Sequence, residues 1–176
     1  TESPFNPVPI DPIVVATYKT ASYSFVAPLL AGAALSAHHY SDKSLATLKA
    51  YATNIGIAFQ LRDDILGIFG DEAKTGKSTV GDLREGKRTV LIELFRKSAS
   101  PDEYELFRQS FGNPQASDES LVKLKELLRA SRAYDKTIEL ENTYVHQATV
   151  ALEGLTSEPL YTDLRDLSAL IQGRGA

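Results

Sequence analysis

Helical periodicity runs through nearly the whole of this chain. In every long stretch the apolar residues recur at three- and four-residue spacing, and no segment alternates apolar and polar side chains as a strand does. A chain of 176 residues is long enough to bury one sizeable core. We therefore expect a single all-α domain over residues 1–176, built as an antiparallel helix bundle.

Capping signals place the helix boundaries. Asp11-Pro12 predicts an N-cap followed by proline at the first helical position of a helix that runs to about residue 38. Ser41 predicts the N-cap of a second helix, which Gly70 ends. Further helices are expected over 88–98, from Ser100-Pro101 to near Gly112, and over 118–130, 132–153 and 160–172. Residues 1–11 are expected to form an extended leader, and residues 71–87 an active-site loop.

Residues 13–37 are long and apolar enough to be compared with a membrane span. Lys19 and Pro28 argue against that interpretation, since a lysine in lipid is costly. The small residues at 31–34 suit close packing between helices. We therefore expect a buried bundle helix and no membrane span.

Composition excludes several classes of function. A net charge of -4 favours neither nucleic acid nor an anionic membrane. The absence of cysteine excludes disulfides, thiolate metal sites and cysteine nucleophiles, and it fits a cytoplasmic location. Basic residues between 123 and 136 alternate with acidic ones, which indicates a solvated face. His38 and His39 diverge by about 100° on a helix and cannot share one metal ion.

Polar residues interrupt the apolar pattern between 56 and 67. Gln60, Asp63, Asp64 and Gly67 lie three or four residues apart and so share one helix face. Two carboxylates at interior depth require a compensating cation. Gly56 and Gly67 would let a neighbouring helix or a ligand approach the backbone closely. The alternative is that both aspartates pair with Arg62 or with surface bases.

The segment that follows is rich in glycine and carries five basic residues over 71–89. Carboxylates hold hard cations such as magnesium, and lysine and arginine neutralise phosphate oxygens, so the combination suits a magnesium–polyphosphate complex. Gly76-Lys77-Ser78 imitates the end of a nucleotide-binding loop. That motif needs four residues after its first glycine and a preceding strand, whereas here five residues separate Gly70 from Gly76 and a helix precedes them.

These residues carry a family resemblance. FQLRDDILGIFGD, followed by TGKSTVGDLREGKRT, resembles the second aspartate-rich region of trans-isoprenyl diphosphate synthases (polyprenyl synthetases), especially bacterial, actinobacterial geranylgeranyl-type enzymes. Tyr18-Lys19-Thr20-Ala21-Ser22 resembles the family's Lys-Thr element on the preceding catalytic helix. The resemblance covers residues 16–92 closely and the later helices more weakly. It implies the isoprenoid synthase fold.

The resemblance also implies an activity and a set of site residues. The activity is that of a magnesium-dependent prenyltransferase of isoprenoid biosynthesis, which condenses an allylic diphosphate with isopentenyl diphosphate. Asp63 and Asp64 would hold Mg2+. The diphosphate oxygens would contact Lys19, Lys77 and Lys87. Thr20 and Gln60 would lie against the reacting allylic carbon, and Phe59 would line the isoprenoid pocket.

Two departures from the family pattern shape the expectation. Gly67 stands where the family often has a third carboxylate, with Asp71 as an outer substitute. No first aspartate-rich motif is present, nor is the amino-terminal Gly-Lys-Arg element. The chain therefore resembles the carboxy-terminal half of a synthase. We expect the missing amino-terminal half as its partner, an inactive isolated chain, and a homodimer when complete.

Two other functions remain open at this point. A non-catalytic partner subunit of a prenyl synthase would keep the helical architecture, although it would not need so many charged site residues together. A class I terpene cyclase would share the architecture too, but its magnesium motif mixes Asn, Ser or Thr with a carboxylate, and that pattern is absent.

Overall fold

The computed structural model describes residues 11–70 and 79–173, and these contain helices and no strand. The all-α prediction is confirmed. In chain order the elements are α1 (Pro12–Ala16), the π-helix η1 (Thr17–Val26), α2 (Ala27–Leu35), α3 (Asp42–Phe69), α5 (Gly81–Glu85), α6 (Val90–Ser98), α7 (Pro101–Ser110), α8 (Asp118–Ala130), α9 (Arg132–Leu152), the 3-10 turn η2 (Glu153–Leu155) and α10 (Tyr161–Gln172).

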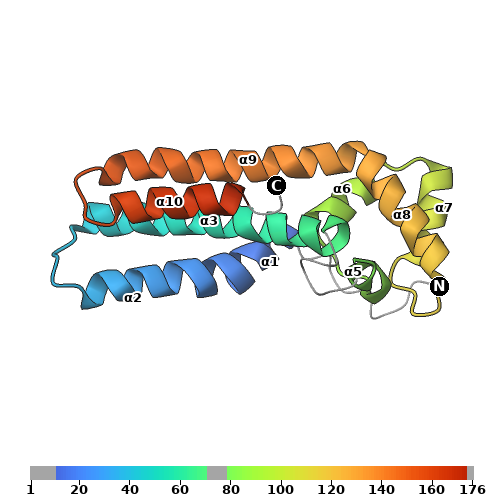
Figure 1. Cartoon of the computed structure of the whole chain (residues 1–176), viewed down its shortest axis with the longest axis horizontal. Coiled ribbons are helices and arrows are strands. Elements are labelled where there is room, and N and C mark those ends of the chain that lie inside the picture. Colours follow the sequence, from blue (N-terminus) through green and yellow to red (C-terminus); the bar gives the residue numbers. More distant parts are fainter. Residues whose placement is uncertain (1–10, 71–78, 174–176) are drawn as a thin grey trace.

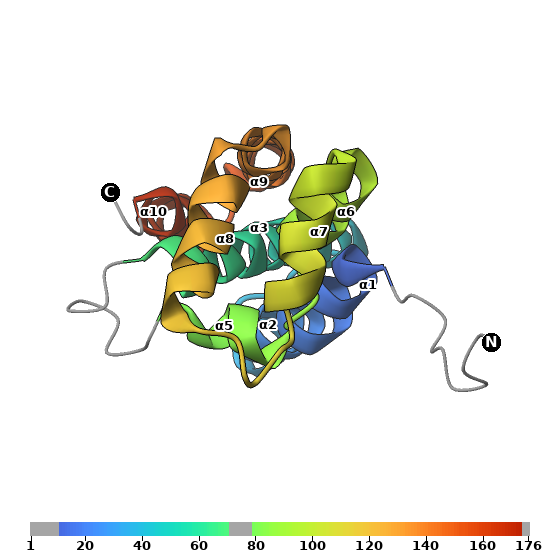
Figure 2. The same ribbon diagram turned by 90° about the vertical axis from the view of Figure 1, so that its right-hand side faces the viewer.

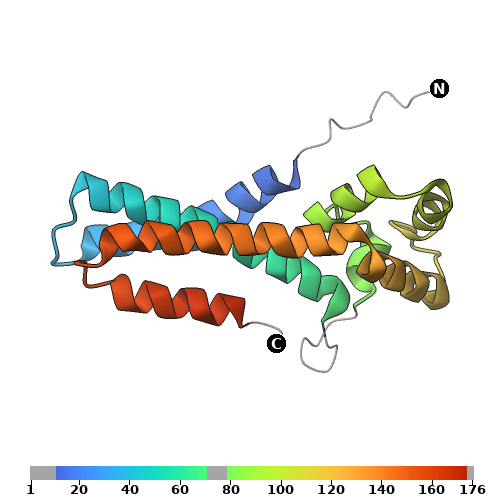
Figure 3. The same ribbon diagram turned by 90° about the horizontal axis from the view of Figure 1, so that it is seen from above.

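Helix α3 is the central element of the bundle. It runs along most of the molecule, and its most extensive contacts are with α9 and η1 (Figure 1). Helix α9 lies beside it in the opposite direction, and α10 returns along both of them (Figure 3). The short helices α5, α6, α7 and α8 gather at one end of the molecule (Figure 2). The end of α3 that carries Gln60, Asp63 and Asp64 therefore contacts these short helices.

Three groups of buried apolar side chains hold this arrangement. One joins α3 to α9 and α10 around Tyr51, whose hydroxyl donates to the Leu164 carbonyl at 2.8 Å. A second joins the short helices around Phe95 and Leu124. The third is small, includes Ala21 and Leu61, and lies directly under the polar residues of α3. Burial of this apolar surface is the main stabilising contribution.

The predicted caps are confirmed because each rests on a local hydrogen bond. The Asp11 carboxylate accepts from Ile13 N at 2.9 Å, and the Ser41 hydroxyl accepts from Ser44 N at 3.1 Å. Ser100 and Glu103 form a reciprocal capping box at the start of α7. Gly70 ends α3 as predicted. The predicted helix over 118–130 has the observed bounds, and those at 132–153 and 160–172 differ from the observed ones by one residue at one end.

Two predicted elements are wrong in detail. The helix expected from Pro12 to about residue 38 ends at Leu35, and its middle is the π-helix η1 rather than α-helix. The π-helix ends next to Pro28, which has no N–H with which to continue the ladder. The expected loop over 71–87 contains the helix α5, since Gly81–Glu85 completes a turn capped by Gly86. The leader 1–10 and residues 71–78 lie outside the described part of the chain.

The amino-terminal helical stretch is not buried, contrary to the prediction. Pro12–Leu35 is the one helix in the described ranges long and apolar enough to cross a membrane, and 17% of its apolar window is buried. Tyr18, Tyr23 and Leu35 are 72%, 80% and 88% exposed. One side of this stretch packs on α3, and nothing else in the described part of the chain covers its outer face. That face is a large apolar surface of the kind that marks an interaction site.

Candidate active site

Helices η1 and α3 approach each other closely enough to join their polar side chains. A Cβ on Gly56 would lie 2.6 Å from the Ala21 Cα, so only glycine permits this spacing. The buried Thr20 hydroxyl consequently donates to Gln60 Oε1. Gln60 Nε2 donates in turn to Asp64 Oδ1 at 2.9 Å, one turn further along α3. The structure thus brings together three predicted site residues.

Lys87 extends this row of polar groups from a third element. It follows α5, and its Nζ lies 3.1 Å from Asp64 Oδ1. The Asp64 side chain is 13% exposed and that of Lys87 is 35% exposed. The alternative that the aspartates of α3 pair with nearby basic side chains is therefore confirmed for Asp64, whose partner is Lys87. The result is a continuous chain of hydroxyl, amide, carboxylate and ammonium groups.

Burial and charge act in opposite directions on the two ionic members. Burial raises the pKa of Asp64 above its ordinary value, and Lys87 and Gln60 offset only part of that effect. Burial also lowers the pKa of Lys87, but Asp64 and Asp82 together outweigh it and raise that pKa above its ordinary value. Lys87 is thus held as an ammonium beside a carboxylate that burial has made more basic.

Asp63 occupies a different environment from Asp64. Its side chain is exposed, so the two aspartates do not share the interior depth expected of them. The alternative pairing with Arg62 is wrong, because Arg62 Nε donates to Glu141 Oε1 of α9 at 2.8 Å. Glu141 is 1% exposed, and its other carboxylate oxygen has no hydrogen-bond partner among the described residues. Burial raises the Glu141 pKa, an effect that Arg62 opposes.

The remaining predicted site residues are placed as follows. Lys19 is exposed on η1, one position before Thr20, and forms no ion pair with the described part of the chain. Phe59 is half-buried, and its ring centroid lies 5.4 Å from that of Phe25. Lys77 and Asp71 lie outside the described residues. The roles of all these residues remain predictions.

Sequence reasoning missed Asp82, which touches the site. Its Oδ2 lies 3.1 Å from Lys87 Nζ. The same oxygen would lie 2.5 Å from a Cβ added to Gly67. The space that a side chain at position 67 would take therefore holds a carboxylate from α5. The available signal was the five-residue spacing of Asp82 and Lys87 around Gly86, in a stretch that the sequence analysis treated as loop.

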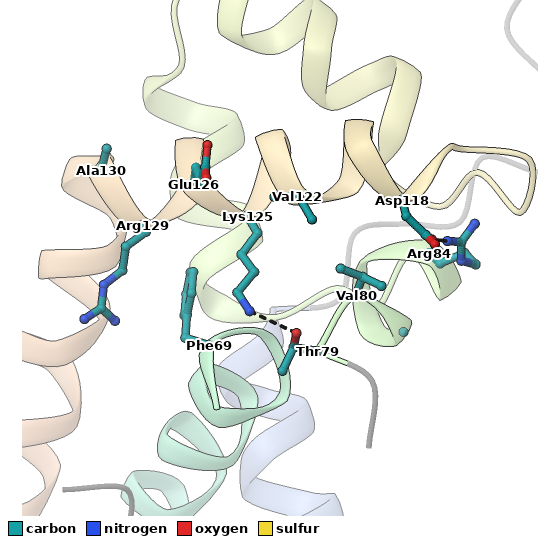
Figure 4. A pocket seen from close by; sticks show the side chains of 11 residues that line it. Phe69, Thr79, Val80, Arg84, Asp118, Val122, Lys125, Glu126, Arg129 and Ala130 are labelled. Atoms are coloured by element: carbon teal, nitrogen blue, oxygen red, sulfur yellow. Dashed lines mark hydrogen bonds and ion pairs between the residues drawn. The ribbon is translucent and has the colours of Figure 1, made fainter. Parts of the chain in front are cut away.

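A cavity of the described region lies apart from this row. About 910 Å³ in volume, it opens between the end of α3, the start of α5 and α8 (Figure 4). Lys125 Nζ donates there to Thr79 Oγ1 at 2.9 Å, and the Arg129 guanidinium lies 5.4 Å from the Phe69 ring centroid. Arg129 is exposed, as the prediction of a solvated face has it, whereas Lys125 is half-buried. None of the described predicted site residues lines this cavity.

The donor set fits magnesium only in part. The described residues contain no group of three or more His, Cys, Asp or Glu side chains placed to hold a metal ion. Magnesium, however, keeps several waters and is commonly held by one or two carboxylates together with substrate phosphates. Lys87 shows that the space beside Asp64 accepts a positive charge. Asp63 and Asp64 supply carboxylate oxygens of the kind that magnesium takes, and their role as its ligands stays a prediction.

The fold and the polar row define the class of this protein, an all-helical protein whose candidate site lies at one end of a long central helix. The sequence model of the polyprenyl synthetase family matches residues 13–128. The chain belongs to the polyprenyl synthetase family.

Individual relatives agree with this assignment. The geranylgeranyl diphosphate synthase of Saccharolobus solfataricus is 35% identical over 120 residues, which are 68% of this chain and 35% of that protein. Human farnesyl pyrophosphate synthase is 33% identical over 109 residues, or 62% of this chain and 26% of that one. A Corynebacterium glutamicum geranylgeranyl pyrophosphate synthase, complexed with isoprenyl diphosphate and magnesium, has a TM-score of 0.82 and 34% identity over 92% of this chain and 46% of its own.

The match covers part of each relative. It spans about a third of the first curated relatives and about half of the solved structures. Over the part that is matched, the chain has the helical fold of these synthases.

Proposed function

We propose that this chain supplies the second aspartate-rich region of a trans-prenyltransferase that condenses an allylic diphosphate with isopentenyl diphosphate. The observation that carries the proposal is the row Thr20–Gln60–Asp64–Lys87, in which η1, α3 and the segment after α5 place four different polar groups side by side. Membership of the polyprenyl synthetase family and the similarity to a synthase crystallised with isoprenyl diphosphate and magnesium support it.

In this proposal Asp63 and Asp64 hold Mg2+ together with diphosphate oxygens. Bound magnesium would supply positive charge that stabilises the departing diphosphate. Asp63 is exposed and the Asp64 side chain is 13% exposed, so the two carboxylates differ in their access to solvent. The raised pKa of Asp64 shows that its surroundings stabilise the negative charge only weakly, and such a carboxylate gains most from a cation. Asp64 is therefore suited to replace Lys87 by magnesium as its partner.

Lys19, Lys77 and Lys87 bind the oxygens of the same diphosphate. The Lys87 ammonium is already directed at Asp64, where an incoming diphosphate would meet it. Lysine neutralises phosphate as a compact charge and keeps three donors available. Negative charge that grows on the leaving diphosphate strengthens these hydrogen bonds, which is the requirement for stabilising a transition state.

Thr20 and Gln60 face the allylic carbon, and Phe59 lines the hydrocarbon side. Thr20 is buried and fixes Gln60 through its hydroxyl, so the amide cannot rotate freely. Oxygen atoms held in this way stabilise positive charge on carbon without reorganisation. The Phe25–Phe59 ring pair supplies an apolar, aromatic wall next to them.

We further propose that turnover needs the remainder of the family architecture, which would cover the exposed face of Pro12–Leu35. The exposure and apolar character of that face support this association, as does the partial coverage of each relative. The chain alone is expected to have negligible synthase activity, and the complete protein is expected to be a cytoplasmic homodimer. The absence of cysteine fits the cytoplasmic location.

Calorimetric titration of the purified chain with inorganic pyrophosphate, in the presence and absence of magnesium, tests the proposed function. We expect magnesium-dependent binding that Asp64→Asn abolishes. Asp166→Asn, which changes an exposed carboxylate on α10, is the matched control and should bind as the unchanged chain does. Absence of magnesium-dependent binding, or equal binding by Asp64→Asn, would reject the proposal.

A second experiment tests the reaction itself. The chain is mixed with the amino-terminal half of the Corynebacterium synthase, and incorporation of labelled isopentenyl diphosphate is measured. We expect an extended prenyl diphosphate only in the mixture. Cyclic hydrocarbon products would favour a terpene cyclase instead, and a change of product length by an already active partner would favour a modulating subunit.

A further inference from the structure

The Asp82 carboxylate lies beside the proposed site, next to both Gly67 and Lys87. A Cβ built on Gly67 would lie 2.5 Å from Asp82 Oδ2 and 3.4 Å from its Cγ. Real Cβ atoms essentially never approach another atom so closely, so any side chain at 67 would displace the carboxylate. Because Gly67 has no side chain, the space beside its Cα in α3 is open, and the Asp82 carboxylate occupies it.

Asp82 and Lys87 are tied to each other through the backbone. Lys87 N donates to the Asp82 carbonyl at 3.0 Å, and Gly86 N donates to the Leu83 carbonyl at 3.2 Å. With Gly86 at φ 71°, these two bonds make the Schellman motif that ends α5. The turn fixes the starting point of the Lys87 side chain relative to Asp82.

The side chains are tied as well. Lys87 Nζ lies 3.1 Å from Asp82 Oδ2 and 3.1 Å from Asp64 Oδ1. A lysine side chain has four flexible carbons, and a single partially exposed ion pair holds it weakly. Two carboxylates restrict the ammonium more strongly than one does. Among the described residues, the charged groups that face it are Asp64 from α3 and Asp82 from α5.

We propose that Asp82 is the positioning residue that holds Lys87 beside Asp64, and that position 67 must be glycine to seat the Asp82 carboxylate. Neither Gly67 nor Asp82 has a role in the proposed function as stated above. The inference depends on the proposed function in one respect, namely that Lys87 binds a diphosphate. The arrangement of Gly67, Asp82 and Lys87 stands without any ligand.

The titration of Lys87, followed by NMR of the chain with 13C-labelled lysine, tests the arrangement directly. We expect Asp82→Asn, an isosteric change, to lower the pKa of Lys87, because Asp82 is one of the groups that raise it. Gly67→Ala should lower the same pKa by expelling the Asp82 carboxylate. The double variant should lower it no further than Asp82→Asn alone, since both changes remove one interaction.

Gly81→Ala provides the matched control. It adds the same methyl group immediately before Asp82, and that methyl meets nothing within 4 Å. The Lys87 pKa should stay at its original value in this variant. An unchanged pKa in Asp82→Asn overturns the proposal, and so does an unchanged pKa in Gly67→Ala. If Gly67→Ala does not fold, Asp82→Asn still decides whether Asp82 holds Lys87.

Magnesium pyrophosphate binding then connects the arrangement to the ligand. Asp82→Asn and Gly67→Ala should each weaken binding about tenfold, the effect of losing one well-directed charge-assisted hydrogen bond. If the unchanged chain binds no pyrophosphate, the proposed function fails while the NMR titration still decides the arrangement. Unchanged affinity in both variants, with a lowered Lys87 pKa, overturns the positioning role.

Discussion

At the scale of single residues, glycines decide where backbone and side chains can approach. Gly86 has φ 71° in the left-handed region, and a Cβ there would lie 2.8 Å from the Gly112 Cα. We expect Gly86→Ala to lower the free energy of unfolding by at least about 1–2 kcal/mol, the cost of the left-handed conformation alone. Urea denaturation measures the change. Gly81→Ala, with open space around its methyl, should leave that free energy nearly unchanged, and equal effects would contradict this explanation.

Much of the candidate site could be predicted residue by residue, and the omissions have a physical cause. Gln60 and Asp64 are one helical turn apart, so periodicity alone predicts their contact. Asp82 reaches Gly67 from another element, and only the three-dimensional structure shows which side chain fills the space above a glycine. Exposure is equally non-local, and for that reason Asp63 and Asp64 were expected to be equivalent although they are not.

At the scale of elements, the close contact of η1 with α3 sets the geometry of Thr20 and Gln60. Gly56→Ala would place a methyl 2.6 Å from the Ala21 Cα and force the two helices apart. We expect a loss of about 1–3 kcal/mol in the free energy of unfolding, typical of overpacking, together with weaker pyrophosphate binding. Thermal or urea unfolding and calorimetry measure the two effects.

The control for this change lies in α2, away from the contact between η1 and α3. Gly32→Ala adds a methyl in α2 with nothing within 4 Å. It should be neutral or stabilise the chain by up to about 1 kcal/mol, because alanine favours helix over glycine. A loss of stability as large as that of Gly56→Ala would show that the helix contact is not the cause.

A buried ion pair joins α3 to α9 behind the site. Arg62→Ala would leave the Glu141 carboxylate buried without its partner, so we expect a loss of about 3 kcal/mol at neutral pH. Burial already raises the Glu141 pKa above the ordinary 4.5, and losing Arg62 raises it further. Folded Arg62→Ala therefore binds a proton more tightly than the unfolded chain. The contribution of Glu141 to the stability of this variant should be greatest below pH 4.5 and should fall as pH rises through the folded-state pKa of Glu141.

Urea denaturation of both chains across this pH range checks the sign. The difference in unfolding free energy between the original chain and Arg62→Ala should grow from acid to neutral pH. Arg62→Ala combined with Glu141→Gln removes the titrating group, and its deficit should be almost independent of pH. A deficit that shrinks towards neutral pH would contradict the assignment of Glu141.

The elements themselves were predictable where their signals are local. Asp11, Ser41 and Ser100 each cap a helix through a bond to a residue two or three positions away. The π-helix was not predictable, because an apolar pattern does not distinguish a hydrogen bond to the fifth residue from one to the fourth. Arg62 and Glu141 lie 79 residues apart, and no local pattern indicates their pairing.

At the scale of the whole molecule, the outer face of Pro12–Leu35 is an apolar surface that remains exposed to solvent. Replacing Tyr23 and Leu35, which are 80% and 88% exposed, by lysine should reduce self-association of the purified chain and leave its helical content unchanged. Sedimentation velocity and circular dichroism measure these properties. Identical association before and after the replacement would show that this face is not the contact surface.

Asp64 and Lys87 are proposed to line one magnesium–diphosphate site. A crystal structure with manganese and pyrophosphate tests this proposal. Manganese replaces magnesium and is located by its anomalous signal. We predict a peak at coordinating distance from Asp64, with a pyrophosphate oxygen within hydrogen-bond reach of Lys87 Nζ. A peak elsewhere, or pyrophosphate bound instead at Lys125 and Arg129 in the cavity beside Phe69, would contradict the account.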